Sequence, residues 1–134
     1  MKISSKTQYA VLAMMHLATR HGDGKPVPTG EIAEAQKIPF KFLTHVMLNL
    51  QEYGLVKALR GKRGGYMLGR EPSLISMGDV VRAVEGSVVR CDVDIETPAY
   101  AAVEALWGDL TKNIEGRLNS TDIKTMIARA QGRA

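Results

Sequence analysis

Hydrophobic residues recur with a helical period through the first third of the chain. Residues 5–20 are apolar nearly all round, which predicts a well-buried helix, and Ser5 with Gln8 matches a capping box at its start. Several helix breakers follow over residues 22–28. A second helix is then expected from Thr29, an acceptable N-cap, to about residue 36.

A third helix is expected over residues 39–53, with Pro39 at the first position, where a missing N–H costs no hydrogen bond. Its core stripe at i, i+3, i+4 and i+7 consists of Leu43, Val46, Met47 and Leu50. Two short helices joined by a short turn are typical of a helix-turn-helix, whose second helix fits the DNA major groove. Such pairs are also common as plain helical hairpins, so the pattern does not decide the function by itself.

A basic, glycine-rich stretch follows at residues 54–69 and reads GLVKALRGKRGGYMLG. Residues 55–59 and 66–68 predict two strands, and Gly54 suits the position just after a helix end. The turn carries three cations separated by glycines, which permit the left-handed backbone that a hairpin tip needs: Arg60, Gly61, Lys62, Arg63, Gly64 and Gly65. Cations crowded on one loop repel each other, so this turn favours an anionic partner.

Three helices followed by a basic hairpin is the order of elements in a winged helix. In that arrangement the hairpin lies beside the groove that holds the third helix. Arg60, Lys62 and Arg63 would then reach phosphates, or one arginine would enter the minor groove. A single geometry therefore explains both the helix pair and the hairpin.

The second half of the chain predicts three more helices. Ser76 and Asp79 form a capping box for a short helix that Gly86 ends, whereas residues 87–97 have no helical stripe. From Thr97, with Pro98 in the first turn, a helix of about 22 residues would be roughly 33 Å long. Its apolar stripe is Ala99, Val103, Leu106, Trp107, Leu110, Ile114 and Leu118. Residues 119–122 cap a last short helix that runs to about residue 129.

A stripe on a helix this long exceeds what a small winged helix can cover, so it predicts a partner, by default a second copy of the chain. The expected fold is mainly α with a small two-stranded β-hairpin. We expect a winged helix-turn-helix DNA-binding domain over residues 1–86, a sensor-like loop over 87–97, and a dimerisation helix with a short terminal helix over 98–134.

Composition agrees with one ordinary soluble domain of 134 residues, 45% of them hydrophobic and 24% charged. No membrane span or signal peptide is expected, and the single cysteine, Cys91, fits a reducing cytoplasm. Residues 1–90 carry 13 Lys and Arg against 7 Asp and Glu, whereas residues 91–134 carry 5 against 7. The front part of the chain is thus the part that would meet a polyanion.

Catalysis is not expected, because the chain has no P-loop, no H-E-x-x-H and no G-x-S-x-G motif. The leading hypothesis is a sequence-specific DNA-binding transcription regulator. A winged helix used as a protein-interaction module is the alternative from another class. A steep salt dependence of DNA binding would favour the regulator, and a flat one the module.

The chain resembles a superfamily of bacterial winged-helix regulators that includes the iron–sulfur cluster regulator, the nitric-oxide-sensitive repressor and the cysteine-metabolism repressor. The matching stretches are residues 4–18, 31–56, 60–86 and 105–123, which follow one another in the right order. The most specific motif is the R-G-x-x-G-G-Y wing that ends at Tyr66, followed by I-x-x-G-D-x-x-x-A-x-E from Ile75 to Glu85.

The resemblance implies a homodimer that crosses its long helices and binds a pseudo-palindromic double-stranded operator, most often as a repressor of iron–sulfur, redox or sulfur metabolism. It implies base or backbone contacts from Lys41, Phe42, Thr44 and His45, and from Arg60 with its wing neighbours up to Tyr66. It also brings Ser5 and Lys6 near the DNA backbone.

The sensor departs from the family pattern. Cluster-binding relatives carry three cysteines in this region, and here only the first is present, as Cys91, while Glu104 stands where some members place a histidine. Three interpretations remain. The protein holds no cluster and senses a small molecule, a partner or a redox signal at Cys91; or it holds a [2Fe–2S] cluster on Cys91 with ligands such as Glu104, His16 or His21; or Cys91 is inert.

Overall fold

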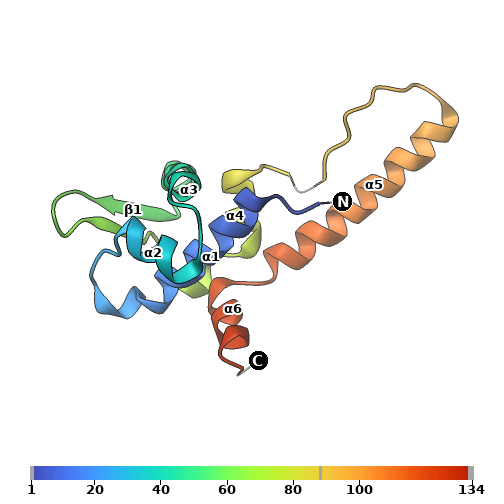
Figure 1. Cartoon of the computed structure of the whole chain (residues 1–134). Helices are drawn as coiled ribbons and strands as arrows, with labels where there is room; N and C mark the ends of the chain where they lie inside the picture. Colours follow the sequence, from blue (N-terminus) through green and yellow to red (C-terminus); the bar gives the residue numbers. More distant parts are fainter. Residues whose placement is uncertain (1, 88, 133–134) are drawn as a thin grey trace.

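The computed structural model describes residues 2–87 and 89–132 and consists mainly of helices (Figure 1). The elements in chain order are α1 (Ser5–Thr19), η1 (His21–Asp23), α2 (Thr29–Gln36), α3 (Phe40–Glu52), β1 (Val56–Leu59), β2 (Gly65–Leu68), η2 (Pro72–Leu74), α4 (Met77–Val84), α5 (Pro98–Asn119) and α6 (Ile123–Ala130). The expected fold class, three helices and a hairpin followed by a long helix, is confirmed.

The core is built around α1, which packs against α2, α3, α4 and α6. This explains why α1 is apolar nearly all round. Its Ala10, Ala13 and Met14 are completely buried, and Leu17 is almost so. The predicted stripe of α3 is buried as well, with all four side chains no more than 2% exposed. Because one side of α3 is fixed in the core, its opposite side is presented to solvent.

The hairpin pairs β1 and β2 in antiparallel register, from Val56 opposite Leu68 to Leu59 opposite Gly65. A two-stranded hairpin is marginal in water by itself. Here Val56 and Leu68 are buried in the core, and Val27, just before α2, exchanges two backbone hydrogen bonds of 2.8 and 2.9 Å with Tyr66. The hairpin is therefore attached both to the core and to the entrance of α2.

Several helix ends match the sequence prediction and others differ from it. The capping box of Ser76 with Asp79 is present, and Gly54 and Gly86 follow helix ends with positive φ. The N-cap of α1 is Ser4 rather than Ser5, however, since Ser4 Oγ accepts from the Thr7 N–H. Thr29 is likewise the first residue of α2, and Pro28 holds the cap position without a side-chain bond.

The N-terminal boundary of α3 also shifts by one residue, because Pro39 is its N-cap and Phe40 its first residue. The hairpin and the later helices lie within a residue or two of their expected bounds. None of the described helices combines the length and the apolar character that crossing a bilayer requires.

Helix α5 extends away from the rest of the molecule, and residues 89–97 run out to its far end (Figure 1). None of its residues is buried. Only its last turns reach the body, where Leu118 packs against the core. The chain then returns through α6, whose Ile123 is completely buried and donates its N–H to the Ile75 carbonyl at 2.9 Å.

Candidate nucleic-acid interface

The turn between α2 and α3 is fixed by local backbone geometry. Lys37 adopts a left-handed conformation with φ of 56°, which ends α2. The next residue, Ile38, is buried and donates its N–H to the Ala33 carbonyl at 2.9 Å. Ile38 thus anchors the turn in the core, and α3 begins two residues later at Phe40. Three residues, Lys37, Ile38 and Pro39, therefore set the direction of α3 relative to α2.

The outer face of α3 carries the four residues expected to contact DNA, Lys41, Phe42, Thr44 and His45, all of them exposed. Phe40 and Leu48 are exposed on the same helix. Lys41 has no acidic partner within the described part of the chain. Thr44 donates its hydroxyl hydrogen to the Phe40 carbonyl at 3.0 Å. The face is therefore a mixture of free cation, imidazole and apolar surface.

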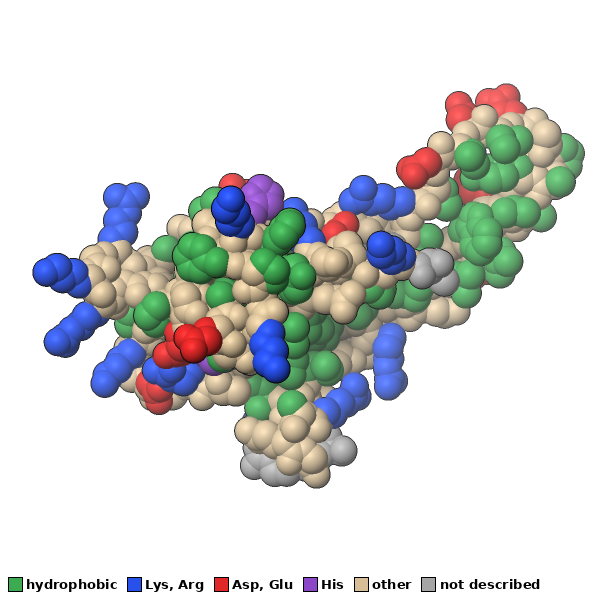
Figure 2. Space-filling model, viewed as in Figure 1, with side chains coloured by type: hydrophobic (Ala, Val, Ile, Leu, Met, Phe, Trp, Pro, Cys, Tyr) green, Lys and Arg blue, Asp and Glu red, His purple; other side chains and the backbone are tan. Residues whose placement is uncertain are grey.

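The tip of the hairpin places Arg60, Lys62 and Arg63 in solvent, and basic side chains project from that end of the molecule in Figure 2. In the described ranges none of the three makes an ion pair or a hydrogen bond. The turn between them needs a glycine at position 61, where φ is 112°. Unpaired cations on a rigidly attached turn favour binding to an anion.

The remaining wing residues shape a shallow groove of about 440 Å³ between the hairpin and the start of α2. Gly65 approaches Val27 so closely that a Cβ there would lie 2.3 Å from the Val27 carbonyl oxygen. Tyr66 is half-buried and belongs to the backbone pair that attaches the hairpin. The groove is lined by Pro28, Thr29, Ala58, Leu59, Arg60, Gly61, Gly64, Gly65 and Tyr66.

The start of α1 carries the other two predicted backbone-contacting residues. Ser5 is exposed and Lys6 half-buried, and Lys6 has no acidic partner in the part of the chain that the structure describes. The neighbouring Ser4 hydroxyl donates to the Glu85 carboxylate at the end of α4. The guanidinium of Arg90 donates to the backbone carbonyl of the same Glu85 at 2.9 Å. The start of α1 is thus tied to the segment that follows α4.

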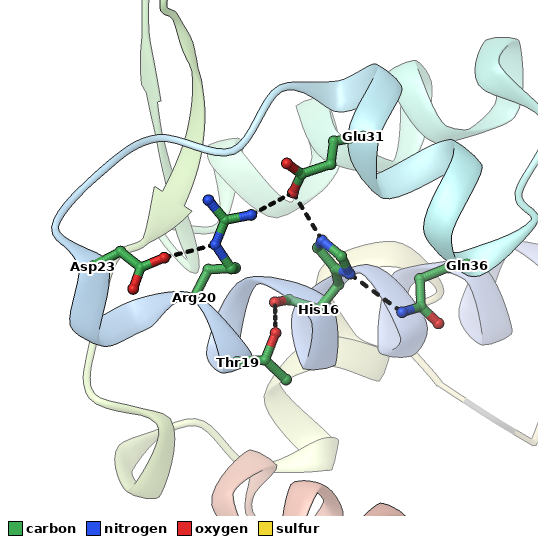
Figure 3. Close-up of polar contacts among 6 residues, drawn as sticks. All are labelled: His16, Thr19, Arg20, Asp23, Glu31 and Gln36. Atoms are coloured by element: carbon green, nitrogen blue, oxygen red, sulfur yellow. Dashed lines mark hydrogen bonds and ion pairs between the residues drawn. The ribbon is translucent and has the colours of Figure 1, made fainter.

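A polar brace that the sequence did not reveal joins α1 to α2 (Figure 3). Glu31 on α2 accepts from Arg20 at 2.7 Å and lies 3.1 Å from His16 Nε2, both at the end of α1. Arg20 also binds Asp23 at 2.7 Å, and Gln36 lies 3.3 Å from His16 Nδ1. No local pattern could have shown this brace, because its links between α1 and α2 join residues that lie 11 to 20 positions apart.

The brace has an electrostatic consequence for Glu31. Its hydrogen bonds to His16 and then to Arg20 stabilise the carboxylate and hold its pKa below the ordinary value of 4.5. Because the brace fixes α2, it also fixes the angle at which the turn delivers α3.

Cys91 lies between α4 and α5 and is exposed. The pKa of Tyr100 at the start of α5 is raised, first by partial desolvation and then by negative charge on Cys91, Glu104 and Asp94. Each of these groups therefore lies near Tyr100. The described residues nevertheless bring together no three His, Cys, Asp or Glu side chains that could hold a metal ion.

The other two candidate ligands are engaged elsewhere. His16 belongs to the brace, and His21 pairs with Glu71 at 3.4 Å. Iron–sulfur clusters are held by four thiolates, or by two with two histidines. The donors of one chain, a single thiol with carboxylates nearby, do not fit such a cluster.

The apolar stripe of α5 is exposed along the part of the helix that lies far from the core. Val103 is 40%, Leu106 53% and Trp107 37% exposed, and hydrophobic surface covers the far part of this helix in Figure 2. Leu110 and Ile114 are half-exposed. Leu118 differs from the other members of the stripe, since it packs against the core of its own chain.

A helix pair in which the second helix presents a polar and apolar outer face, followed by a basic hairpin attached beside it, defines the winged helix-turn-helix class of DNA-binding proteins. The family model of Rrf2, described as iron-dependent transcriptional regulators, matches residues 3–129. The chain belongs to this family. It is a DNA-binding transcription regulator and not an enzyme.

Individual relatives agree with the family match. The chain is 36% identical over 131 residues to the HTH-type transcriptional regulator IscR of Klebsiella pneumoniae, which covers 95% of this chain and 80% of that protein. The solved structure of CymR, the global cysteine regulator of B. subtilis, has a TM-score of 0.82 at 32% identity and covers 96% of this chain and 98% of its own. T. potens IscR has a TM-score of 0.80 at 36% identity, with coverages of 97% and 88%.

Proposed function

We propose that the protein is a homodimeric, sequence-specific repressor that binds a pseudo-palindromic operator on double-stranded DNA. The observation that carries this proposal is the set of four cations without a described acidic partner, Lys41 on α3 and Arg60, Lys62 and Arg63 on the wing. Cations held on fixed elements without counter-charges lower the free energy of binding to phosphates through counterion release.

In this proposal α3 and the wing contact different parts of the DNA. α3 enters the major groove, where Lys41, Phe42, Thr44 and His45 meet base edges, while Ser5 and Lys6 approach the backbone. Arg60, Lys62 and Arg63 reach phosphates or the minor groove. Gly61, Gly64, Gly65 and Tyr66 hold the wing in the shape that makes those contacts, as the groove beside α2 suggests.

The dimer forms through the exposed part of α5. Val103, Leu106 and Trp107 expose apolar surface on a helix without a single buried residue, which a second copy would cover. Leu110 and Ile114 continue the stripe, and Leu118 at its end contributes mainly within the chain. Two recognition helices would then face two half-sites, which explains the expected symmetry of the operator.

The signal is the second part of the proposal. The relatives include a global cysteine regulator and IscR proteins, so we propose that the regulated genes serve iron–sulfur or sulfur metabolism. We also propose that the protein acts in the cytoplasm. Because the donors of one chain do not fit an iron–sulfur cluster, we propose that the protein responds to a small molecule, a partner or a redox change at the exposed Cys91.

A selection experiment tests the proposed function. The purified protein is mixed with duplexes containing a randomised central region, and bound duplexes are recovered and sequenced. The expected result is enrichment of an inverted repeat whose half-site centres lie about one helical turn or a multiple of it apart. Absence of any enriched sequence, or a non-repeated one, would contradict a sequence-specific dimer.

A further inference from the structure

Two phenylalanine side chains at the start of the recognition helix lie in solvent. Phe40 is 57% and Phe42 64% exposed, on a helix whose buried side is fully occupied by four other residues. Neither ring has a hydrogen-bonding atom. A large apolar side chain in this place gives the fold little, so its chemistry points to the partner of the helix.

Phe42 is held in place from behind. Its ring lies 6.3 Å from that of Tyr9 on α1, centroid to centroid, at an interplanar angle of 45°. Tyr9 in turn packs against the hydrophobic core. A supported ring needs less ordering when it binds than a free one. Within the described chain Phe40 has no such ring contact, which distinguishes Phe42 as the preorganised of the two.

Part of the surface around Phe42 is apolar as well. The only hydroxyl hydrogen of Thr44 is donated to the Phe40 carbonyl, so this side chain offers its methyl group and acceptor lone pairs but no donor. Leu48, one turn further on, is 47% exposed. Hydrophobic and basic side chains gather together over α3 in Figure 2. The helix thus combines apolar contact surface with neighbouring Lys41.

This combination fits one major-groove feature in particular. Thymine presents a 5-methyl group in the major groove, and apolar side chains including phenylalanine read it by contact. The wing cations Arg60, Lys62 and Arg63 would meet the flanking phosphates, which a purely apolar protein partner would not require. We propose that Phe42 is a specificity-determining residue that reads a thymine methyl group in each operator half-site. This inference rests on the proposed DNA-binding function.

Replacing thymine by deoxyuridine tests it, because only the methyl group is removed while phosphates and hydrogen-bonding groups stay. The probe is an enriched duplex from the selection, with deoxyuridine placed at one thymine position of both half-sites at a time. For the wild type we expect one position at which Kd rises about fourfold per methyl, or about fifteenfold for two, as removal of one buried CH2-sized group implies.

The variant Phe42→Ala should bind the thymine and deoxyuridine duplexes within about twofold of each other, since it removes the apolar contact that reads the methyl. Phe42→Leu, which keeps an apolar side chain, should retain an intermediate difference. Leu74→Ala removes a side chain that is 67% exposed but lies outside α3 and the wing, and should retain the full difference. Circular dichroism checks that each variant is folded.

The proposal is overturned if no thymine position shows the loss, or if Phe42→Ala shows the same loss as the wild type. The second result would mean that the ring serves a protein partner or the fold instead. These outcomes differ from failure of the proposed function, in which no duplex is enriched and DNA binding does not depend on salt, and which overturns both proposals.

Discussion

At the residue scale, local chemistry decided which helix ends could be read from the sequence. The Ser76–Asp79 box involves two side chains three residues apart, and it is present. At the start of α1, Ser4 and Ser5 are both suitable N-cap residues. Ser4 takes the position and also donates to Glu85, which lies 81 residues further on. Local sequence holds no information about that contact, so Ser5 was the wrong choice.

The brace at Glu31 gives a prediction about pH. Its pKa is lowered in the folded state, so the stability it contributes is present above its unfolded pKa of about 4.5 and is lost as pH falls through the lower folded value. Glu31→Gln should therefore destabilise the protein near neutral pH, and the difference from wild type should shrink in acid. Because Glu31 is 41% exposed, we expect the difference to stay below about 1 kcal/mol.

Urea unfolding of both proteins at several pH values measures this difference. Asp23→Asn is a matched control, because it removes the second carboxylate of Arg20 but leaves the link from α1 to α2. A difference for Glu31→Gln that grows as the pH falls would contradict the role of the carboxylate.

At the element scale, the hairpin and the long helix were both predictable because each is a local pattern, strands around a glycine turn and an apolar stripe after Pro98. Their attachments were not. The backbone pair of Val27 with Tyr66, which holds the wing, connects distant residues. The contact between α4 and α5 does so as well. At that contact Arg82 donates to Asn119 at 2.9 Å, and Gly78 leaves no room for a Cβ beside the Asn119 side chain.

Gly65→Ala tests the attachment of the wing. The new Cβ would lie 2.3 Å from the Val27 carbonyl oxygen, so the hairpin must move away from the entrance of α2. We expect a loss of about 1–3 kcal/mol in the free energy of unfolding, as for other changes that force backbone to shift. We also expect weaker DNA binding, because the wing cations are displaced.

Gly22→Ala is the control for this change, since a Cβ there meets nothing within 4 Å. Chemical denaturation and fluorescence anisotropy on labelled duplex measure the two effects. Stability and affinity equal to wild type in Gly65→Ala would show that the wing does not depend on this close approach.

At the scale of the whole molecule, α5 and the winged helix have different requirements. The core around α1 includes Ile123 of α6 as well as residues of the winged helix, whereas α5 contributes no buried residue. The sequence could predict that the long helix would stay largely uncovered, because its length exceeds what a small winged helix can cover. It could not predict that the described residues bring no three candidate ligands together near Cys91, because that depends on how distant segments pack.

Leu106→Asp tests the proposed dimer. Leu106 is 53% exposed in one chain, so an aspartate there costs the monomer little, but it would place a charge in an apolar interface. Sedimentation should show a change from dimer to monomer with helical content preserved. Glu115→Asp, a conservative change at an exposed site of the same helix, should leave the dimer intact. A dimer that survives Leu106→Asp would place the interface elsewhere.

The central claim is that this chain binds DNA through the cations of its wing and recognition helix. The most direct test is the salt dependence of Kd for an enriched duplex, compared between wild type and Arg60→Ala. For six wing–phosphate contacts in a dimer, log K should fall against log[salt] with a slope of about −5, and Arg60→Ala should reduce its magnitude by about 2. A flat salt response in the wild type, or an unchanged slope in Arg60→Ala, would contradict the claim.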